Sequence, residues 1–265
     1  MDDLVGEAER LVRMGVKEIL LIAQELTYYG LDLYKRRALP ELLHRLADIK
    51  GLEWIRLHYA YPSKFPLEIL DVIRERDNIC KYLDMPLQHA SDNMLKAMRR
   101  QITRAEMTEL IHTIRERVPG ICLRTTLIAG FPGETAADVE ELKEFLVEHR
   151  FDRVGIFPYS HEEGTSAGEL VDDIPADVKQ QRAQEIMEVQ QEISYEKNQE
   201  KVGKVFRTLI DKKEAGRYLG RTEFDSVEVD NEVIIHSPKP LTVGDFVQVQ
   251  ITKAYDYDIE GEVVH

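Results

Sequence analysis

A candidate ligand-binding turn lies at Gly130-Phe-Pro-Gly-Glu-Thr135. These residues follow a predicted strand and precede a predicted helix, which is where α/β folds collect their ligands. The two glycines would let the backbone approach a nucleoside closely. The same composition also suits a tight turn with Thr135 as the helix cap, so both interpretations stay open. The segment is neither a P-loop nor a dinucleotide-binding fingerprint.

Three polar side chains lie at the ends of other predicted strands. Gln24 ends one strand, and Gln88 and His89 follow another. In a parallel barrel these ends meet at one rim, where an amide and an imidazole would bind a ribose or a carboxylate. Each of these side chains is equally compatible with an ordinary loop role in which backbone groups are its partners. Their shared position makes a binding rim the sharper hypothesis.

Arg124 is unusual because it is a charged residue within a predicted strand. Such a side chain must point into the barrel interior or pair with a carboxylate. One interpretation is a structural ion pair with Asp84 or Glu134. The alternative is a guanidinium that binds the carboxylate of a substrate.

Two other motifs do not support the chemistry that they suggest. Gly164-Thr-Ser-Ala-Gly168 matches the G-x-S-x-G pattern of serine hydrolases, but the required strand–turn–helix context is missing, which argues against Ser166 as a nucleophile. Cys80 and Cys122 are the only cysteines, and their spacing fits no zinc or redox motif. We therefore predict no metal site in this sequence.

The elements that must position these residues follow an α/β pattern up to about residue 170. Short runs of branched residues alternate with segments of helical period, which predicts a partial or full (β/α) barrel of the TIM type. The predicted strands are 18–24, 54–59, 81–85, 121–128 and 153–159, and the predicted helices lie near 2–14, 40–49, 66–77, 91–99, 103–117 and 136–149. Because the chain opens on a helix, the first strand of such a barrel has no candidate.

A connector and a second domain are predicted after the barrel. A polar helix over 175–202 begins at a proline and ends before Gly203. We therefore expect an α/β domain at 1–172, a connecting helix at 173–202 and a further domain at 203–265.

The last of these domains has the pattern of a small all-β, OB-like barrel. Its short alternating runs are VFRTLI, SVEVD, EVIIH, FVQVQITKA and IEGEVV. Arg217 and Arg221 flank a tyrosine in what we interpret as a short loop, which would grip nucleic acid.

The charge balance argues against that partner. The chain has 35 Lys and Arg against 49 Asp and Glu, a net charge of −14, and residues 203–265 alone carry a net −4. Affinity for nucleic acid depends mostly on cations that neutralise phosphates. The composition therefore argues against DNA as a partner and makes transfer RNA an unfavourable one.

Nothing in the sequence suggests a membrane. No apolar run approaches the roughly 20 residues that cross a bilayer, and Asp2 and Asp3 stand where a signal peptide would be basic. With 43% hydrophobic residues and two cysteines, we expect a globular protein of the reducing cytoplasm.

Six segments resemble a known enzyme family. They are ILLIAQELTYYGLDLY (19–34), HYAYPSKFP (58–66), MPLQHASDNMLKAMRR (85–100), TTLIAGFPGET (125–135), FPYSHEEGTSA (157–167) and GRTEFDSVEVDNEV (220–233). Together they resemble the radical S-adenosylmethionine methylthiotransferases. The resemblance implies an amino-terminal cluster-binding domain, a radical S-adenosylmethionine barrel and a carboxy-terminal TRAM β-barrel, of which the last two have counterparts here.

The resemblance also implies cofactors. The family uses S-adenosylmethionine and two 4Fe–4S clusters, and a C-x-x-x-C-x-x-C motif ligates the cluster that cleaves S-adenosylmethionine. That motif and the amino-terminal domain have no counterpart in this sequence. Because three thiolates hold that cluster, we expect a fragment that is catalytically inactive and holds no cluster.

Site residues follow by position from the same resemblance. Ile128 and the Gly130 turn correspond to the adenine-side strand, and Tyr159 corresponds to a backbone contact of the last strand. Gln24 and Gln88 correspond to the amino-acid and ribose region, with Arg124 as a further cofactor contact. Arg217 and Arg221 are the candidates for substrate binding by the TRAM barrel.

Two branches of the family differ in substrate. One methylthiolates the β-carbon of an aspartate in the small-subunit ribosomal protein S-twelve, with sulfur and electron donors as further partners. The other modifies isopentenyl-adenosine in transfer RNA. The acidic chain would complement a basic ribosomal protein, which favours the first branch; a non-catalytic substrate-binding module is the remaining alternative.

Overall fold

The computed structural model describes residues 1–264, and its first part is an open sheet of five parallel strands in sequential order. The strands are β1 (Glu18–Leu21), β2 (Trp54–Leu57), β3 (Ile79–Asp84), β4 (Cys122–Ala129) and β5 (Arg153–Pro158). Each strand pairs with the next one, and β1 and β5 form the two edges. The predicted α/β class with a partial parallel barrel is confirmed.

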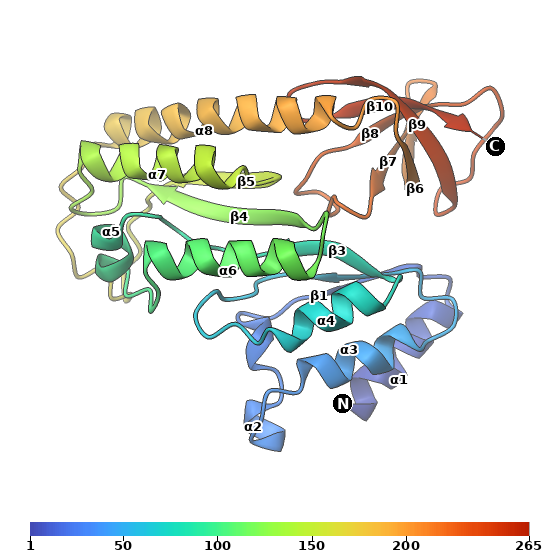
Figure 1. The fold of residues 1–265 in the computed structure, drawn as a ribbon, viewed down its shortest axis with the longest axis horizontal. Coiled ribbons are helices and arrows are strands. Elements are labelled where there is room, and N and C mark those ends of the chain that lie inside the picture. Colours follow the sequence, from blue (N-terminus) through green and yellow to red (C-terminus); the bar gives the residue numbers. More distant parts are fainter. Residues whose placement is uncertain (265) are drawn as a thin grey trace.

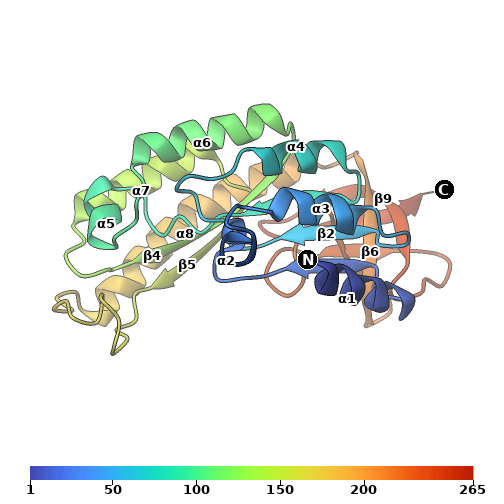
Figure 2. The same ribbon diagram turned by 90° about the horizontal axis from the view of Figure 1, so that it is seen from below.

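Helices occupy the connections and cover one face of this sheet (Figures 1 and 2). They are α1 (Asp2–Arg13), α3 (Leu39–Ala47), α4 (Glu68–Glu75), α5 (Asp92–Ala97), α6 (Arg104–Arg117) and α7 (Ala136–His149), with the short η1 (Leu26–Tyr28) and α2 (Leu31–Tyr34) after β1. The six longer helices match the predicted ones closely. The two short segments were not anticipated, because so few residues show no helical period.

Side-chain caps determine where two of these helices begin. Thr103 and Glu106 form the predicted capping box at the start of α6. Thr135 and Asp138 form a second box at the start of α7, in which the Thr135 amide donates to the Asp138 carboxylate at 2.8 Å. Each box satisfies amide groups that a helix start leaves without partners.

The helix-covered face of the sheet is apolar. The side chains of Ile55, Leu57, Leu83, Leu123 and Leu127 are buried there and belong to one hydrophobic core with the helices. Burial of each such side chain stabilises the fold by roughly 1.5–3 kcal/mol. This outer face anchors the strands whose carboxyl ends carry the polar residues.

Helix α8 (Ala176–Gln199) leads from the sheet to a second barrel, and it packs on α7 and β5 (Figure 1). The Gln190 amide donates to the carbonyl of Phe151 at 3.0 Å, next to the start of β5. The Asn198 amide donates to the carbonyl of Tyr257 at 2.8 Å in the second barrel. The helix is therefore bonded to both parts of the molecule.

The carboxy-terminal barrel is closed and all-β, as predicted. Its strands are β6 (Val205–Glu214), β7 (Arg217–Thr222), β8 (Val233–His236), β9 (Phe246–Ala254) and β10 (Ile259–Val264), in the order β10-β8-β7-β6-β9. The barrel lies at the amino-terminal ends of the sheet strands (Figure 1). Trp54, Cys80 and Cys122 of the sheet share an apolar cluster there with Leu209 of β6.

Two local interpretations of this barrel are wrong. Arg217 to Arg221, interpreted as a loop, lie in strand β7; a Cβ at Gly220 would come within 2.2 Å of the Leu209 carbonyl, so the glycine permits close strand pairing. Ser226 to Asp230, interpreted as a strand, form part of the loop between β7 and β8. The side chains of Ser226 and Asp230 contact residues of the sheet part, whereas Val227 and Val229 are exposed.

The sequence contains no apolar run long enough to cross a bilayer, and the same requirement applies to the helices of the structure. Within residues 1–264, no helix combines the length and the apolar character that crossing a bilayer requires.

Candidate functional site

A pocket of about 420 Å³ lies at the carboxyl ends of the sheet strands. Parallel α/β folds bind their ligands at this end. Three residues singled out from the sequence line the pocket together: Gln24, Gln88 and Arg124. The other lining residues are Glu25, Tyr59, Tyr61, Pro86, Arg100, Thr126, Phe157 and Val229.

Gln88 reaches the pocket because its backbone extends the sheet beyond β3. Its amide donates to the carbonyl of Thr126 at 2.9 Å, and its carbonyl accepts from the amide of Ile128 at 2.8 Å. Its φ of +74° lies in the left-handed region, which a residue other than glycine adopts only where its surroundings hold it. The two sheet bonds to β4 hold this conformation.

Arg124 points from β4 toward the inner face of the sheet, where two carboxylates hold it. Its Nη1 lies 2.8 Å from Asp84 Oδ1, and its Nε lies 3.2 Å from Asp230 Oδ1. Burial acts to raise the pKa of Asp84, but the contacts with His58 and Arg124 hold that pKa below its usual value. Of the two interpretations of Arg124, the ion pair with Asp84 is present, and the guanidinium still lines the pocket.

Several lining residues carried no clear sequence signal. Glu25 organises the turn after β1, since its carboxylate accepts from the amides of Thr27 at 2.8 Å and Tyr61 at 3.3 Å. The Arg100 guanidinium stacks over the ring of Tyr61 at 4.4 Å. Tyr61 lies in the HYAYPSKFP segment, where its place in the family pattern was the only available signal.

The Gly130 turn is built around a buried glutamate. The Gly130 amide donates to both oxygens of Glu134 at 2.9 and 3.0 Å, and Arg182 of α8 pairs with the same carboxylate at 3.0 Å. His89 Nε2 lies 3.4 Å from it. A Cβ at position 130 would overlap the Lys179 side chain at 2.3 Å. The turn-and-cap interpretation of this segment therefore describes its contacts, with Glu134 as its centre.

Ile128, Gly130 and Tyr159 lie at the same end of the sheet but are not among the residues that line the pocket. The Tyr159 amide donates to the carbonyl of Ala129 at 2.8 Å, and its ring contacts the edge of Phe131. A cofactor contact through the backbone of these residues stays a prediction.

The two arginines predicted to bind substrate occupy different environments. Arg217 is exposed on β7. Arg221 is buried, and its guanidinium pairs with Asp211 at 2.7 Å and with Glu18 of β1 at 2.8 Å. Because its donors are used between the two barrels, we carry only Arg217 into the substrate proposal.

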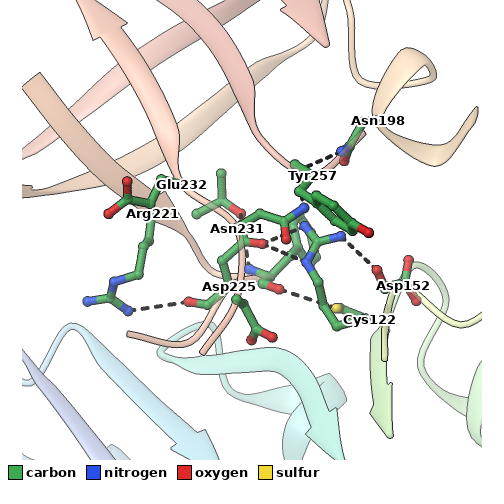
Figure 3. Close-up of polar contacts among 12 residues, drawn as sticks. Cys122, Asp152, Asn198, Arg221, Asp225, Asn231, Glu232 and Tyr257 are labelled. Carbon is green, nitrogen blue, oxygen red and sulfur yellow. Dashed lines mark hydrogen bonds and ion pairs between the residues drawn. The ribbon is translucent and has the colours of Figure 1, made fainter. Parts of the chain in front are cut away.

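The inner face of the sheet is polar and is covered by the β7–β8 loop, residues 223–232. Arg56 donates to the carbonyl of Glu223 at 2.6 Å, and Arg153 pairs with Asp225 at 2.5 Å. The Arg221 Nη1 donates to the carbonyl of Asp225, so strand β7 and this loop brace each other (Figure 3). Burial opposes ionisation of Asp225, yet Arg153 and Lys201 hold its pKa below the usual value.

Neither cysteine fits an iron–sulfur cluster. Cys80 and Cys122 are buried at the end of the sheet opposite the pocket, and the Cys122 thiol donates to the carbonyl of Phe224 at 3.3 Å (Figure 3). Burial raises the pKa of Cys80 to about 12 and raises the pKa of Cys122 as well. A cluster of this kind needs three thiolates, and this chain has two cysteines held as thiols.

The glycines around Ser166 serve a turn. A Cβ at Gly168 would come within 2.2 Å of the Glu162 carbonyl, and Ser166 is exposed in this turn beyond β5. A nucleophile elbow would require a strand directly before Ser166 and a helix directly after it, whereas Ser166 lies within a turn.

Comparison with protein families now decides the affiliation. The radical SAM superfamily matches residues 1–146, which is more than half of the chain, and the TRAM domain family matches residues 202–264. The chain belongs to the radical SAM superfamily. Most residues that line its pocket lie in the radical SAM part, Val229 comes from the TRAM domain, and the carboxy-terminal barrel is that TRAM domain.

Several curated relatives of this radical SAM chain are named ribosomal protein uS12 methylthiotransferase RimO. The chain is 56% identical over 263 residues to the protein of Flavobacterium psychrophilum, covering 99% of the chain and 61% of that relative. It is 55% identical over 266 residues to the protein of Phocaeicola vulgatus, covering 100% of the chain and 62% of that relative. The resemblance to radical S-adenosylmethionine methylthiotransferases is confirmed, and the chain spans about three fifths of these relatives' length.

Solved structures share the fold. Coproporphyrinogen III oxidase (HemN) from Escherichia coli, a radical SAM enzyme, superimposes with a TM-score of 0.55 at 16% identity, covering 83% of this chain and 60% of that one. Methylornithine synthase (PylB) gives a TM-score of 0.50 at 13% identity, covering 72% of this chain and 53% of that one. These likenesses support the barrel architecture alone.

Proposed function

We propose that this chain binds S-adenosylmethionine and substrate within an enzyme that methylthiolates the β-carbon of an aspartate in ribosomal protein uS12. The observation that carries this proposal is the identity of 53–56% with uS12 methylthiotransferases along nearly the whole chain. The pocket at the strand ends supplies a site of suitable chemistry.

The pocket offers complementary groups to S-adenosylmethionine. The amides of Gln24 and Gln88 face a space that Tyr59 and Tyr61 also line. Amides suit the ribose hydroxyls and the amino-acid group, and aromatic rings suit the flat base. In this proposal, the backbone near Ile128 and Gly130 contacts the adenine side.

Reductive cleavage of S-adenosylmethionine lies outside what these residues support. The two cysteines are buried thiols far from the pocket rim and do not fit the cluster. We infer that the 265-residue chain by itself binds but does not cleave S-adenosylmethionine. The chain's own contribution is to hold the two reactants and to exclude water between the two barrels.

The charge of the chain supports a protein substrate. Its net charge is −14, and residues 203–265 carry 8 Lys and Arg against 12 Asp and Glu. A basic ribosomal protein is attracted by such a surface, whereas transfer RNA is repelled. In this proposal, exposed Arg217 contacts the substrate from the TRAM domain.

The test is a pair of titrations of this chain, one with isolated uS12 and one with unmodified transfer RNA, at low, physiological and high salt. We expect tighter binding of uS12 at every salt concentration. Arg217→Ala should weaken uS12 binding by about two- to fivefold, since a rim charge contributes modestly. Lys239→Ala, a change of another exposed cation in the same domain, is the matched control and should leave the affinity unchanged.

Preference for transfer RNA with a steep salt dependence would contradict the uS12 assignment and favour the transfer-RNA branch. Production of 5′-deoxyadenosine by the chain with added iron, sulfide and reductant would contradict the claim that it cannot cleave S-adenosylmethionine alone.

A further inference from the structure

The β7–β8 loop of the TRAM domain, residues 223–232, reaches from the carboxy-terminal barrel onto the inner face of the five-stranded sheet. Ser226 Oγ lies 2.9 Å from Nε2 of His58 on the sheet, and the Tyr82 hydroxyl donates to Asp230 at 2.8 Å. The amide of Ser226 donates to the same Asp230 carboxylate at 2.8 Å. The loop is therefore held on the inner face of the sheet by several strands at once.

The tip of this loop forms part of the pocket wall. Val229 lines the pocket with Thr126 and Phe157, although it is 103 and 72 residues away from them in the chain. Its neighbour Asp230 has a side chain that is 1% exposed and accepts from Arg124 Nε at 3.2 Å. Val229 thus lines the pocket directly, and Asp230 acts on it through its ion pair with Arg124.

Arg124 keeps one donor free in this arrangement. Asp84 occupies Nη1 and Asp230 occupies Nε, while Nη2 has no hydrogen-bond partner within residues 1–264. A Cβ at Gly155 would lie 3.7 Å from Nη2, so the glycine leaves this side of the guanidinium uncovered. A fixed, uncovered N–H group is a donor for an oxygen acceptor.

A second cavity of about 310 Å³ adjoins the pocket at this point. Arg124 and Val229 line both spaces. The second cavity is otherwise bounded by β5, by Gln190 and Ser194 of α8, and by Asn231 and Tyr257 of the TRAM domain. The loop tip therefore stands at the boundary between the pocket and the space beneath it, where an inserted side chain would end.

We propose that Val229 and Asp230 determine substrate specificity from the TRAM domain. Val229 forms the part of the pocket wall against which the inserted side chain of the substrate packs. Asp230 is a positioning residue that orients Arg124, so that Nη2 meets an oxygen of that side chain, the carboxylate in the case of an aspartate. This inference rests on the proposed function and gives the TRAM domain a part in the pocket itself.

The test compares Val229→Trp with Val227→Trp in the same chain. Both valines are exposed on the β7–β8 loop, at 54% and 38%, but Val227 is not among the residues that line the pocket. The probes are a synthetic peptide with the target aspartate of uS12 and, separately, S-adenosylhomocysteine. V229W should weaken peptide binding by about tenfold or more through steric overlap, and should weaken S-adenosylhomocysteine binding by less, since Val229 also lines the pocket proposed for that cofactor. V227W should change neither.

A second comparison isolates the role of Asp230. The unaltered chain should bind the aspartate peptide about tenfold more tightly than the same peptide with alanine, and Asp230→Asn should remove most of that preference. Ser226→Ala loosens the loop by removing its contact with His58 but does not touch Arg124. It should keep the preference.

Equal effects of the two tryptophan variants on the peptide would overturn the inference, and so would weaker S-adenosylhomocysteine binding with unchanged peptide binding. Retention of the aspartate preference in D230N would remove the role of Asp230. If the unaltered chain binds no peptide, the proposed function fails and the inference fails with it.

Discussion

The two faces of the five-stranded sheet are stabilised in different ways. On the outer face, Leu57, Leu83 and Leu127 pack against helices in a continuous apolar core. On the inner face, Arg56 and Arg153 meet carboxylates and carbonyls, many of them from the β7–β8 loop. The outer face requires only matching shape and hydrophobicity, whereas the inner face requires a specific partner for each charge.

This difference shows how the TRAM domain is tied to the radical SAM part. A buried charge without a partner costs several kcal/mol, so the arginines of the sheet and the acids of the loop are stable only when the two parts are docked. Within residues 1–264, the same network leaves Nη2 of Arg124 without a hydrogen-bond partner. Paired charges thus fix the interface, and Arg124 also lines the pocket.

The largest effect is expected from breaking the inner face. Arg153→Ala removes the partner of Asp225, and both side chains are almost fully buried. An uncompensated buried carboxylate should lower the free energy of unfolding by about 3–5 kcal/mol. Urea denaturation followed by circular dichroism measures this change.

A surface ion pair between the end of α7 and helix α8 is the control for that experiment. Arg150 lies 2.8 Å from Glu196, with both side chains largely exposed. Arg150→Ala should cost less than about 1 kcal/mol, and the double variant Arg153→Met, Asp225→Leu should recover part of the loss. Equal costs for the two single arginine variants would contradict the contrast between a paired inner face and a solvated surface.

A smaller loss of stability is expected at the Gly130 turn, which packs against Lys179 of α8. Gly130→Ala puts a Cβ at a φ of +77° and against Lys179, and should cost about 2–4 kcal/mol. Gly133→Ala has a φ of +80° but no atom within 4 Å of the new Cβ, and should cost only about 1–2 kcal/mol. Thermal melts of both variants show whether close packing or backbone conformation makes Gly130 necessary.

The smallest effect comes from a polar group in the apolar outer layer. Burial lowers the pKa of His149 to about 4 from the usual 6.5. The folded state therefore binds this proton less readily than the unfolded state, so the stabilisation is complete above pH 6.5 and is lost as the pH falls toward 4. The expected loss is roughly 2–3 kcal/mol.

Variants at two neighbouring histidines test that assignment. His149→Gln should flatten the dependence of unfolding free energy on pH between 6.5 and 4. His112→Gln removes a neighbouring ring, 5.9 Å from that of His149, whose charge helps to lower the pKa of His149, so it should reduce the slope by less than H149Q does. A slope that H149Q does not alter would place the acid sensitivity in the inner-face carboxylates instead.

Much of the fold followed from local patterns. The branched runs predicted all five sheet strands, and the capping residue Thr103 marked the start of α6. Strand β7 was predicted to be a loop, and part of the β7–β8 loop was predicted to be a strand. The second error arose because SVEVD (226–230) alternates like a strand, whereas Ser226 and Asp230 are buried by contacts with the sheet part. The periodicity of apolar residues indicates that one side of a segment is buried, but it does not indicate which neighbouring element buries that side.

The candidate site was predictable only in part for the same reason. Gln24 and Gln88 follow the carboxyl ends of β1 and β3, and chain order alone brings such ends together in a parallel sheet. Arg124 lies inside β4, and its side chain reaches the pocket from the inner face of the sheet. The partners of Arg124 were another matter. Asp84 was foreseen, while Asp230, 106 residues later in the chain, was not.

By itself, the sequence determined the α/β part, the small β-barrel, the polar rim and the shortage of thiolates. These properties depend on composition, local period and the order of strands. Only the tertiary structure decided that the β7–β8 loop docks on the inner face, that Arg221 forms an ion pair with Glu18, and that Val229 lines the pocket. Contacts of this kind join residues far apart in the chain, and a charge finds its partner only when both parts have folded against each other.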